Sequence, residues 1–348
     1  MDLYNIGLNE NLESLVEIHD RENLSTVNEL NPTIVGVNCR NLKKMELDFS
    51  RFERFFPRLP KDSLKVAESG FKSTKKIKIV ELESLNQVTK NSKGLIQIIK
   101  VTKCSNTRPG KLYKSNAQYV LNNLTYSIEQ TMQNEGTALV TGPLSKENII
   151  SIDKLFTGHT EYIKKITKSK DVLMMLASDQ LRVALSTTHI PLKNVSKTIT
   201  KELIINKVKI LNEDLKNKFN IKKPNIKVLG LNPHAGENGK IGKEEQDHIK
   251  PAIGELRKKK INVSMPISAD TAFSKKSLKE ADAYLGMYHD QVLPVLKTLS
   301  FGNSINITLG IPIIRTSVDH GIALDIAGTS KSDSSSLILA IKTAKKLI

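Results

Sequence analysis

The chain has 348 residues with 53 Lys and Arg against 36 Asp and Glu, which gives a formal net charge of +17. Hydrophobic residues make up 39% and charged residues 26%, a balance that excludes a mainly disordered protein and suggests about two domains. The basic excess is mostly lysine scattered along helix-like segments, only 5% of residues are aromatic and Trp is absent, so we expect no nucleic-acid partner. A positive field would still attract an anionic substrate.

The first 72 residues alternate between short strands and helices. The predicted elements are strands over 15–19, 33–38 and 64–67 and helices over 21–30 and 48–56. Such repeats imply parallel strands joined by crossover helices. The strands end near Glu17, Asn38 and Glu68, and the carboxyl ends of parallel strands carry the chemistry in α/β folds.

These segments resemble a known family. "LVEIHD", "VGVNCRNLKKMELDF" and "LPKDSLKVAESGF" are similar to three consecutive strands of indole-3-glycerol-phosphate synthase, an eightfold β/α barrel. The resemblance implies that Glu17, Asn38, Glu68 and Ser69 occupy catalytic and substrate positions. The strands that carry that family's catalytic lysines have no counterpart here, and three strands cannot close a barrel. We therefore expect no ring-closing activity from this segment, and turnover in an indole-ring-closure assay would contradict that.

A basic stretch, residues 73–76, separates this segment from the rest, so we predict a partial β/α-barrel segment over 1–72 and an α/β region over 76–348. The second region is predicted to hold strands over 77–80, 95–101, 138–141, 226–231, 283–287, 305–309 and 313–317, apolar runs over 172–177 and 182–186, and helices over 116–133, 201–219, 244–259 and 333–347. Alternation of this kind indicates an α/β fold.

Three histidines follow predicted strands. They are His189 in "STTHIPL", His234 in "LGLNPHAGENGKIG" and His289 in "GMYHDQ". Three neutral imidazoles with an open position describe a catalytic site for zinc or a related divalent ion. The spacing is not a metal motif by itself, so each could instead be a capping or hydrogen-bonded histidine.

Further polar residues suggest an anion site. In "FTGHTEY", Gly158, His159 and Thr160 suit a phosphate or carboxylate, although an ordinary helix N-cap is the alternative. Lys297 and Arg315 adjoin apolar strands, together with the amide of Asn306, and they indicate either a bound anion or internal salt bridges.

Two carboxylates lie close to these segments. Asp270 in "ISADTAF" and Asp290 beside His289 could ligate a metal, orient a histidine or take a proton, and the alternative for each is a turn or cap residue. The glycines of the loop over 236–242 do not follow the dinucleotide-binding pattern.

Residues 75–348 resemble the 4-hydroxythreonine-4-phosphate dehydrogenase family of vitamin B6 synthesis. "TGPLSK", "FTGHTEY", "STTHIPL", "GLNPHAGE", "ADTAF", "MYHDQVLPVLK", "NITLGIP" and "RTSVDHG" occur in that family's order. The resemblance implies a two-lobed isocitrate/isopropylmalate-dehydrogenase-like fold with parallel and mixed sheets. It also implies NAD-dependent oxidation of 4-phosphohydroxy-L-threonine with decarboxylation, by a homodimer whose active site lies at the interface.

The resemblance further assigns roles to residues. It implies that His189, His234 and His289 bind a divalent metal (Zn, Mg or Co), that His159, Thr160, Lys297, Asn306 and Arg315 contact the substrate, that Asp270 and Lys297 are catalytic, and that His320, Gly321 and Asp325 bind NAD. The last three lie in "DHGIALDIAG", which resembles the nucleotide-binding turn of isocitrate-type dehydrogenases.

Two departures from that family keep an alternative open. Its members begin with a strand and a Gly/Pro-rich turn that residues 1–75 do not supply, and Ile322 stands where the family usually has Thr. The alternative is therefore a fused or remnant chain that binds metal and phosphate without turnover. Production of NADH from the substrate would decide between the two.

Sequence features also bear on the cellular compartment. No apolar run approaches the roughly 20 residues that a membrane span requires, and the first residues lack a secretory signal. With only Cys39 and Cys104 there is no disulfide framework. We expect a cytoplasmic protein with no membrane partner.

Overall fold

The computed structural model describes residues 15–18, 22–32, 34–38, 40–41, 46–47, 54–61, 64–68, 78–90, 94–105, 107–300, 303–329 and 331–348. The chain forms two compact units, Met1–Ile99 and Lys100–Ile348. The boundary between the two units lies after the basic stretch over 73–76. One further pair of strands, which follows that stretch, belongs to the first unit.

The first unit contains a three-stranded parallel sheet in the order β1-β2-β5. Its elements are β1 (Leu15–Ile18), α2 (Asn23–Leu30), β2 (Ile34–Asn38) and β5 (Leu64–Glu68), with an antiparallel pair β3 (Arg40–Asn41) and β4 (Glu46–Leu47) and a parallel pair β6 (Lys78–Leu82) and β7 (Leu95–Ile99). The three predicted strands are confirmed as neighbours, and Asn38 aligns with Glu68 at their carboxyl edge. Ser69 and residues 48–53 lie outside the described residues, and so does most of the helix predicted over 48–56; a 3-10 turn, η1 (Phe56–Arg58), begins at the last residue of that range.

The second unit is built on one seven-stranded sheet, ordered β11-β12-β10-β9-β13-β14-β8. Its strands are β8 (Ala138–Thr141), β9 (Leu173–Ala177), β10 (Arg182–Leu185), β11 (Ile226–Val228), β12 (Ala283–Gly286), β13 (Ile305–Leu309) and β14 (Ile314–Val318). Strands β10, β11 and β12 are parallel, whereas β9 runs antiparallel to both of its neighbours. Strands β14 and β8 are parallel to each other, and β14 is antiparallel to β13. The sheet is mixed, as expected for the fold.

Helices cover this sheet. They are α4 (Ala117–Gln133), α5 (Lys146–Ile150), α6 (His159–Ile166), α7 (Leu192–Thr198), α8 (Lys201–Asn217), α9 (Lys250–Lys258), α10 (Ala269–Ala272), α11 (Lys275–Glu280), α12 (His289–Leu299) and α13 (Ser335–Leu347), with a 3-10 segment η5 (Pro233–Gly239) and a π-helical turn η6 (Glu245–Ile249). The four long helices predicted from periodicity are present. The shorter ones carry too few turns for a periodic signal.

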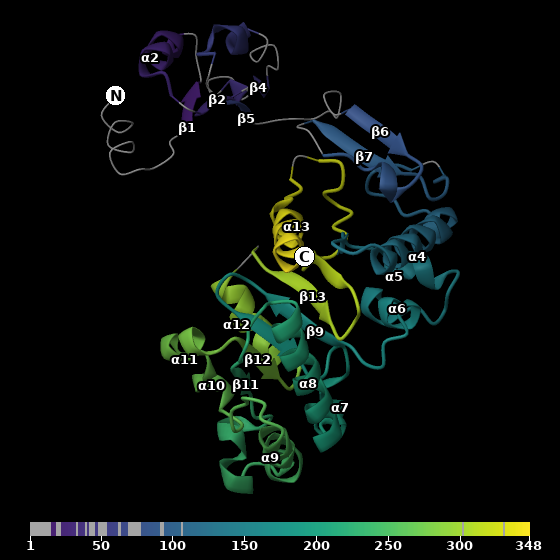
Figure 1. Cartoon of the computed structure of the whole chain (residues 1–348), viewed down its shortest axis with the longest axis vertical. Helices are drawn as coiled ribbons and strands as arrows, with labels where there is room; N and C mark the ends of the chain where they lie inside the picture. The colour runs from purple at the N-terminus through teal and green to yellow at the C-terminus, as the bar shows by residue number, and fades with distance from the viewer. Residues whose placement is uncertain are drawn as a thin grey trace. The chain divides into compact units, whose positions relative to one another are not determined.

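One face of the sheet packs against α8 and α13 (Figure 1). Leu173, Met175, Ile305 and Ile307 alternate along their strands and are fully or nearly fully buried there. Burial of each such side chain contributes roughly 1.5–3 kcal/mol to stability. The strict alternation places the intervening residues on the other face.

The opposite face has two apolar ends and a polar middle. Leu176 and Val183 pack with Val292 of α12 at one end, and a second apolar cluster lies beneath α4 and α6 at the other. Between them the strands present the polar residues Thr141, Asn306, Thr308, Arg315 and Ser317. This polar strip is where the sheet can hold a ligand.

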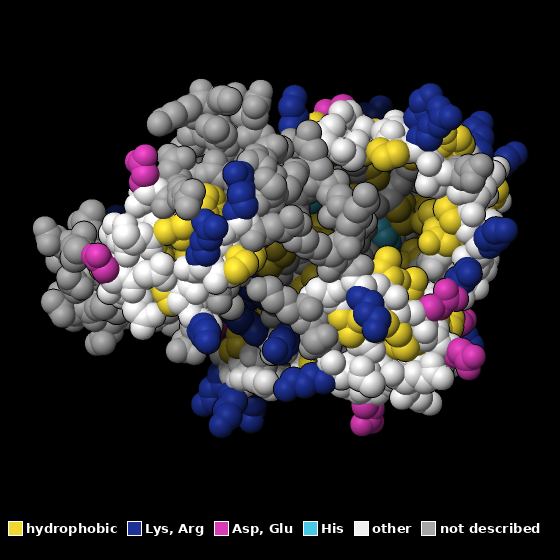
Figure 2. Space-filling model, turned by 90° about the horizontal axis from the view of Figure 1, so that it is seen from above, with side chains coloured by type: hydrophobic (Ala, Val, Ile, Leu, Met, Phe, Trp, Pro, Cys, Tyr) yellow, Lys and Arg dark blue, Asp and Glu magenta, His cyan; other side chains and the backbone are white. Residues whose placement is uncertain are grey.

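Among the described residues, no helix combines the length and apolar character that crossing a bilayer requires. Lys and Arg side chains occupy several separate places on the surface shown in Figure 2.

Candidate active site

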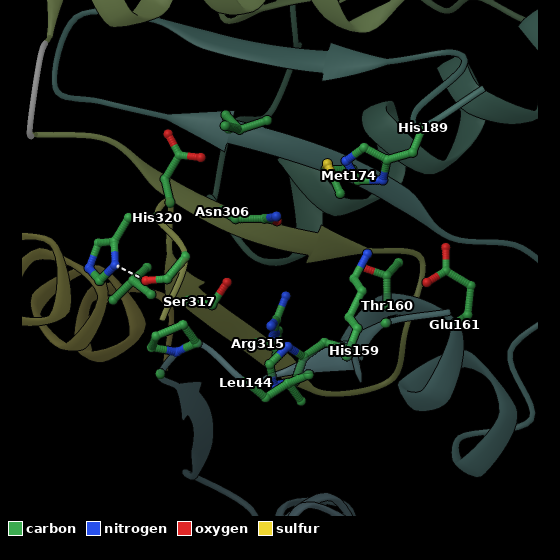
Figure 3. A pocket seen from close by; sticks show the side chains of 18 of the residues that line it. Leu144, His159, Thr160, Glu161, Met174, His189, Asn306, Arg315, Ser317 and His320 are labelled. Atoms are coloured by element: carbon green, nitrogen blue, oxygen red, sulfur yellow. Dashed lines mark hydrogen bonds between the residues drawn. The ribbon is translucent and has the colours of Figure 1, made fainter. Parts of the chain in front are cut away.

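A cavity of about 450 Å³ opens over the polar strip. Its lining includes residues 142–144 and 146, 158–161, 174, 176, 189, 289, 293, 306, 315 and 317–321. Figure 3 shows Arg315, Asn306 and His159 in the middle of this cavity, His189 at one end and His320 at the other. The residues come from segments far apart in the chain, so only the folded sheet brings them together.

Arg315 is a buried cation for which the described residues supply no acidic partner. Its side chain is 2% exposed, and its guanidinium donates to Thr308 Oγ1 at 3.0 Å and Thr141 Oγ1 at 2.7 Å. In the described part of the chain, its Nε has no hydrogen-bond partner. Burial lowers the pKa of Arg315 to about 10, which leaves it charged at neutral pH. A buried charge that lacks a counter-ion is suited to bind an anion.

His159 lies beside Arg315 at the first turn of α6. Burial, then the charges of Arg315 and Lys146, lower the pKa of His159 to about 3, so its imidazole is neutral. Gly158 precedes the helix at φ 157° and ψ −179°, a conformation that essentially only glycine adopts. The N-cap residue is Gly158, whereas Thr160 lies within α6 and lines the cavity.

The two predicted cations have different surroundings. Lys297 Nζ forms an ion pair with Asp319 Oδ2 at 3.0 Å and is not part of the cavity lining, so for this residue the internal salt bridge is observed. Ser304 donates to the same carboxylate at 2.8 Å. Asn306 lines the cavity, and among the described atoms its Oδ1 is buried without a partner. Arg315 and Asn306 are therefore the residues left available to a ligand.

Two of the three predicted histidines meet at one end of the cavity. His189 and His289 follow the adjacent parallel strands β10 and β12, and their ring centroids lie 5.8 Å apart. Burial, followed by the charges of Lys146 and His289, lowers the pKa of His189, partly opposed by Glu161. A neutral imidazole is the form that ligates a metal.

Gln291 fixes the strand ends that precede His289 and His234. Its Oε1 accepts a hydrogen bond from Met287 N at 2.7 Å, and its Nε2 donates to Gly230 O at 2.6 Å. The first contact holds the end of β12 and the second holds the end of β11. His289 Nδ1 lies 3.2 Å from Asp290 Oδ1, so Asp290 is placed to orient that ring.

His234 and Asp270 lie outside this cavity. His234 is exposed on the turn that follows β11, and no group of three or more His, Cys, Asp or Glu side chains in the described part of the chain could hold a metal ion. Asp270 is also exposed, and its pKa is lowered first by a hydrogen bond from Ser268 and also by His234. The two therefore form a separate pair near the carboxyl edge of the same sheet.

Of the three residues expected to bind NAD, two line the cavity and one does not. His320 and Gly321 line the cavity, and His320 Nδ1 lies 2.9 Å from Gly321 O, whereas Asp325 is not part of the lining. Sequence reasoning did not single out the lining residues Lys146 and Glu161. Lys146 is the last residue of "TGPLSK", a segment that begins with the final residue of β8, and this position shortly after a strand end was the available signal.

The seven-stranded mixed sheet and its polar cavity define an α/β protein with the isocitrate/isopropylmalate-dehydrogenase-like fold. A family model described as pyridoxal phosphate biosynthetic protein PdxA matches residues 61–344. The chain belongs to this family of 4-hydroxythreonine-4-phosphate dehydrogenases. Membership supports an oxidoreductase role in pyridoxal phosphate biosynthesis.

Individual relatives agree. The 4-hydroxythreonine-4-phosphate dehydrogenase of Pseudoalteromonas translucida (strain TAC 125) is 49% identical over 271 residues, which is 78% of this chain and 82% of the relative. That of Enterobacter sp. (strain 638) is 48% identical over 255 residues, 73% of this chain and 78% of the relative. The crystal structure of the enzyme from Klebsiella pneumoniae has a TM-score of 0.71 and 28% identity, and the match covers 95% of this chain and 98% of that one.

The N-terminal resemblance is also confirmed. A family model described as indole-3-glycerol phosphate synthase matches residues 1–89, which overlaps the first match over residues 61–89. The chain therefore joins a segment similar to one family to a longer region that belongs to another.

Proposed function

We propose that this chain oxidises 4-phosphohydroxy-L-threonine, with NAD and a divalent metal ion, and that decarboxylation then yields 3-amino-2-oxopropyl phosphate for pyridoxal 5'-phosphate synthesis. The observation that carries the proposal is the buried guanidinium of Arg315, which faces a cavity without an acidic partner in the described chain. The imidazoles of His189 and His289 lie at one end of the same cavity.

The middle of the cavity suits the phosphate of the substrate. Arg315 supplies the charge, Thr160 supplies a hydroxyl, and the first turn of α6 supplies backbone N–H groups. Asn306 has a buried carbonyl oxygen that requires a donor, and the amino group of the substrate could provide one. Lys297 would reach the same anion only by leaving Asp319.

The histidine end fits a divalent ion. Two imidazoles that share one ion at about 2.1 Å place their ring centres roughly 5–6 Å apart, and the observed separation of His189 and His289 is 5.8 Å. When bound, such an ion would act as a Lewis acid on the alcohol of the substrate and on the enolate left by loss of CO₂. The described residues offer no third ligand within one chain, so we propose that a second copy supplies His234 as the third ligand, together with Asp270 as the proton acceptor.

Exposed apolar side chains support a homodimer. Five of them lie near His159, His189, His234 and Asp270 in the chain: Leu155, Ile190, Leu192, Ile241 and Met265. Large apolar side chains gathered around a functional site indicate a surface that a partner covers. In an isologous dimer each copy would complete the site of the other.

The residues of the chain then have distinct tasks. Arg315 holds the phosphate and so fixes the position of the reacting carbon, while Met174, Leu176 and Leu293 restrict water around it. Asp270, kept ionised by the hydrogen bond from Ser268, is the proposed proton acceptor.

The other end of the cavity has room for the nicotinamide cofactor. His320 and Gly321 line it, and a Cβ on Gly321 would meet no atom within 4 Å. We propose that these two residues and Asp325 hold NAD, which would take up the hydride from the secondary alcohol. The alcohol proton leaves to a base, the carboxyl carbon leaves as CO₂, and the adjacent carbon gains a proton.

The direct test supplies the purified chain with 4-phosphohydroxy-L-threonine, NAD and a divalent ion, and measures NADH and CO₂. We expect both products in equal amounts. Binding of metal and phosphate without NADH would favour the alternative of a catalytically silent fusion.

Subunit mixing tests the shared site. The variants His189→Ala and His234→Ala should each be inactive, and a mixed dimer of the two should regain activity because one of its two sites is intact. If His234 acted within its own chain, mixing would restore nothing.

A further inference from the structure

The turn that presents His234 has an unusual backbone. His234, Ala235, Glu237 and Asn238 all have positive φ, between 41° and 59°, with Gly236 at 78° between them. Left-handed helical backbone costs roughly 1–2 kcal/mol for each residue that is not glycine. Four such residues in one short turn would not keep this shape without strong external contacts.

Glu245 supplies those contacts from the π-helical turn η6. Glu245 is 1% exposed, and its Oε1 accepts hydrogen bonds from Leu231 N at 2.7 Å and Asn232 N at 2.8 Å. Oε2 accepts from Asn232 Nδ2 at 2.9 Å. No Lys, Arg or His forms an ion pair with it in the described chain, so N–H donors alone compensate this buried charge. π-helical turns often mark functional sites.

The turn closes tightly around this carboxylate. A Cβ on Gly236 would lie 2.6 Å from Glu245 Oε2, and one on Gly230 would lie 3.1 Å from Glu245 Oε1. The amide of Asn232 also donates to Glu244 Oε2 at 2.8 Å, and a Cβ on Gly242 would overlap that amide. Gly230 and Gly236 therefore pack against Glu245, and Gly242 packs against Asn232, which is hydrogen-bonded to Glu245.

We infer that Glu245 is a positioning residue whose buried carboxylate holds the left-handed turn in the shape that offers His234 to a divalent ion. The inference rests on the proposed metal site. Glu245 is buried against this turn, so it would act through the backbone that carries His234. Residues that orient a ligand in this way typically change metal affinity by about 10–100-fold.

Glu245→Gln keeps the shape of the side chain but removes an acceptor, and Glu244→Gln is the matched control. Glu244 also bonds to Asn232 but is only partly buried and accepts no backbone N–H from residues 231 and 232. Without metal, we expect Glu245→Gln to accelerate hydrogen exchange of the 231 and 232 amides about tenfold or more while the central strands stay protected. Titration with Co²⁺ should show binding weakened by about 10–100-fold, and the control should differ little from wild type.

A double-mutant cycle distinguishes positioning from general support of the fold. If Glu245 acts through His234, Glu245→Gln should change Co²⁺ affinity no further in a His234→Ala background. An equal loss in both backgrounds, or unchanged affinity in the single variant, would overturn the assignment. Should Glu245→Gln not fold, Gly236→Ala offers a second perturbation, since its Cβ displaces the same carboxylate and should weaken Co²⁺ binding alike.

The two proposals fail in different ways. A wild-type chain that binds no divalent ion would overturn the metal site and with it the role assigned to Glu245. Normal metal binding that is insensitive to Glu245→Gln would overturn only the positioning role.

Discussion

Replacing Arg315 with Met should separate ligand binding from stability. The substitution removes a buried charge and keeps a long side chain in a position that is 2% exposed. Because the guanidinium has no carboxylate partner in the described chain, no acidic group is left unpaired. This differs from the loss of one member of a buried ion pair, which costs about 3–5 kcal/mol.

The magnitude follows from the surroundings of Arg315. Its pKa falls from 12.5 to about 10, which corresponds to a penalty of about 3 kcal/mol on the charged form. Removing the charge relieves that penalty but leaves the hydroxyls of Thr308 and Thr141 without their donors, at a cost of about 1 kcal/mol each. The free energy of unfolding should therefore change by less than about 2 kcal/mol, in the stabilising direction. Affinity for inorganic phosphate should fall at least about tenfold, since a hydrogen bond to a charged group contributes about 1.5–3 kcal/mol.

Calorimetric phosphate titration and urea denaturation measure the two effects. Arg257→Met is the control, because Arg257 lies on α9 and donates to Val263 O at 2.9 Å instead of facing the cavity. Undiminished phosphate affinity in Arg315→Met would refute the anion site. A stability loss above about 3 kcal/mol would show that Arg315 has an acidic partner after all.

The remaining predictions concern the neighbours of this cation. The pKa of His159 is lowered from 6.5 to about 3, so the unfolded chain takes up a proton first as pH falls below 6.5. Stability contributed by the neutral ring is present above that pH and is lost by up to about 1.4 kcal/mol per pH unit below it, a loss that His159→Gln should reduce in urea denaturation. Lys146→Met should raise the imidazole pKa of His159 and His189 in NMR titrations, because the charge of Lys146 lowers both, whereas Lys275→Met on α11 should not. Gly158→Ala should destabilise the chain by about 1–3 kcal/mol, since φ 157° suits only glycine, and unchanged denaturation would contradict the strain.

Strand positions made part of the site readable from sequence. His189 and His289 both follow apolar strands, and the sheet places those strands side by side and parallel, so the rings meet. The order of the strands was not readable, because β12 inserts between β10 and β11 although it follows both in the chain. Pairings of this kind depend on long-range packing, which carries no local periodic signal.

The alternatives for the two cations show the same limit. Sequence reasoning could not choose between an anion and a salt bridge for Lys297 or Arg315, because either outcome places a cation beside an apolar strand. Lys297 forms an ion pair with Asp319, which directly follows β14. Arg315 lines the cavity and donates hydrogen bonds to the hydroxyls of two threonines.

Strand–helix alternation, the family motifs and the histidines at strand ends were determined by the sequence alone, because backbone periodicity and residue chemistry are local properties. Tertiary structure alone decided that no acidic side chain among the described residues pairs with Arg315 and that His234 lies on a left-handed turn outside the cavity of its own chain. Charge pairing and backbone strain depend on which segments approach one another and on how deeply they are buried. Glu245 contacts this turn because the chain reverses its direction between residue 232 and residue 245.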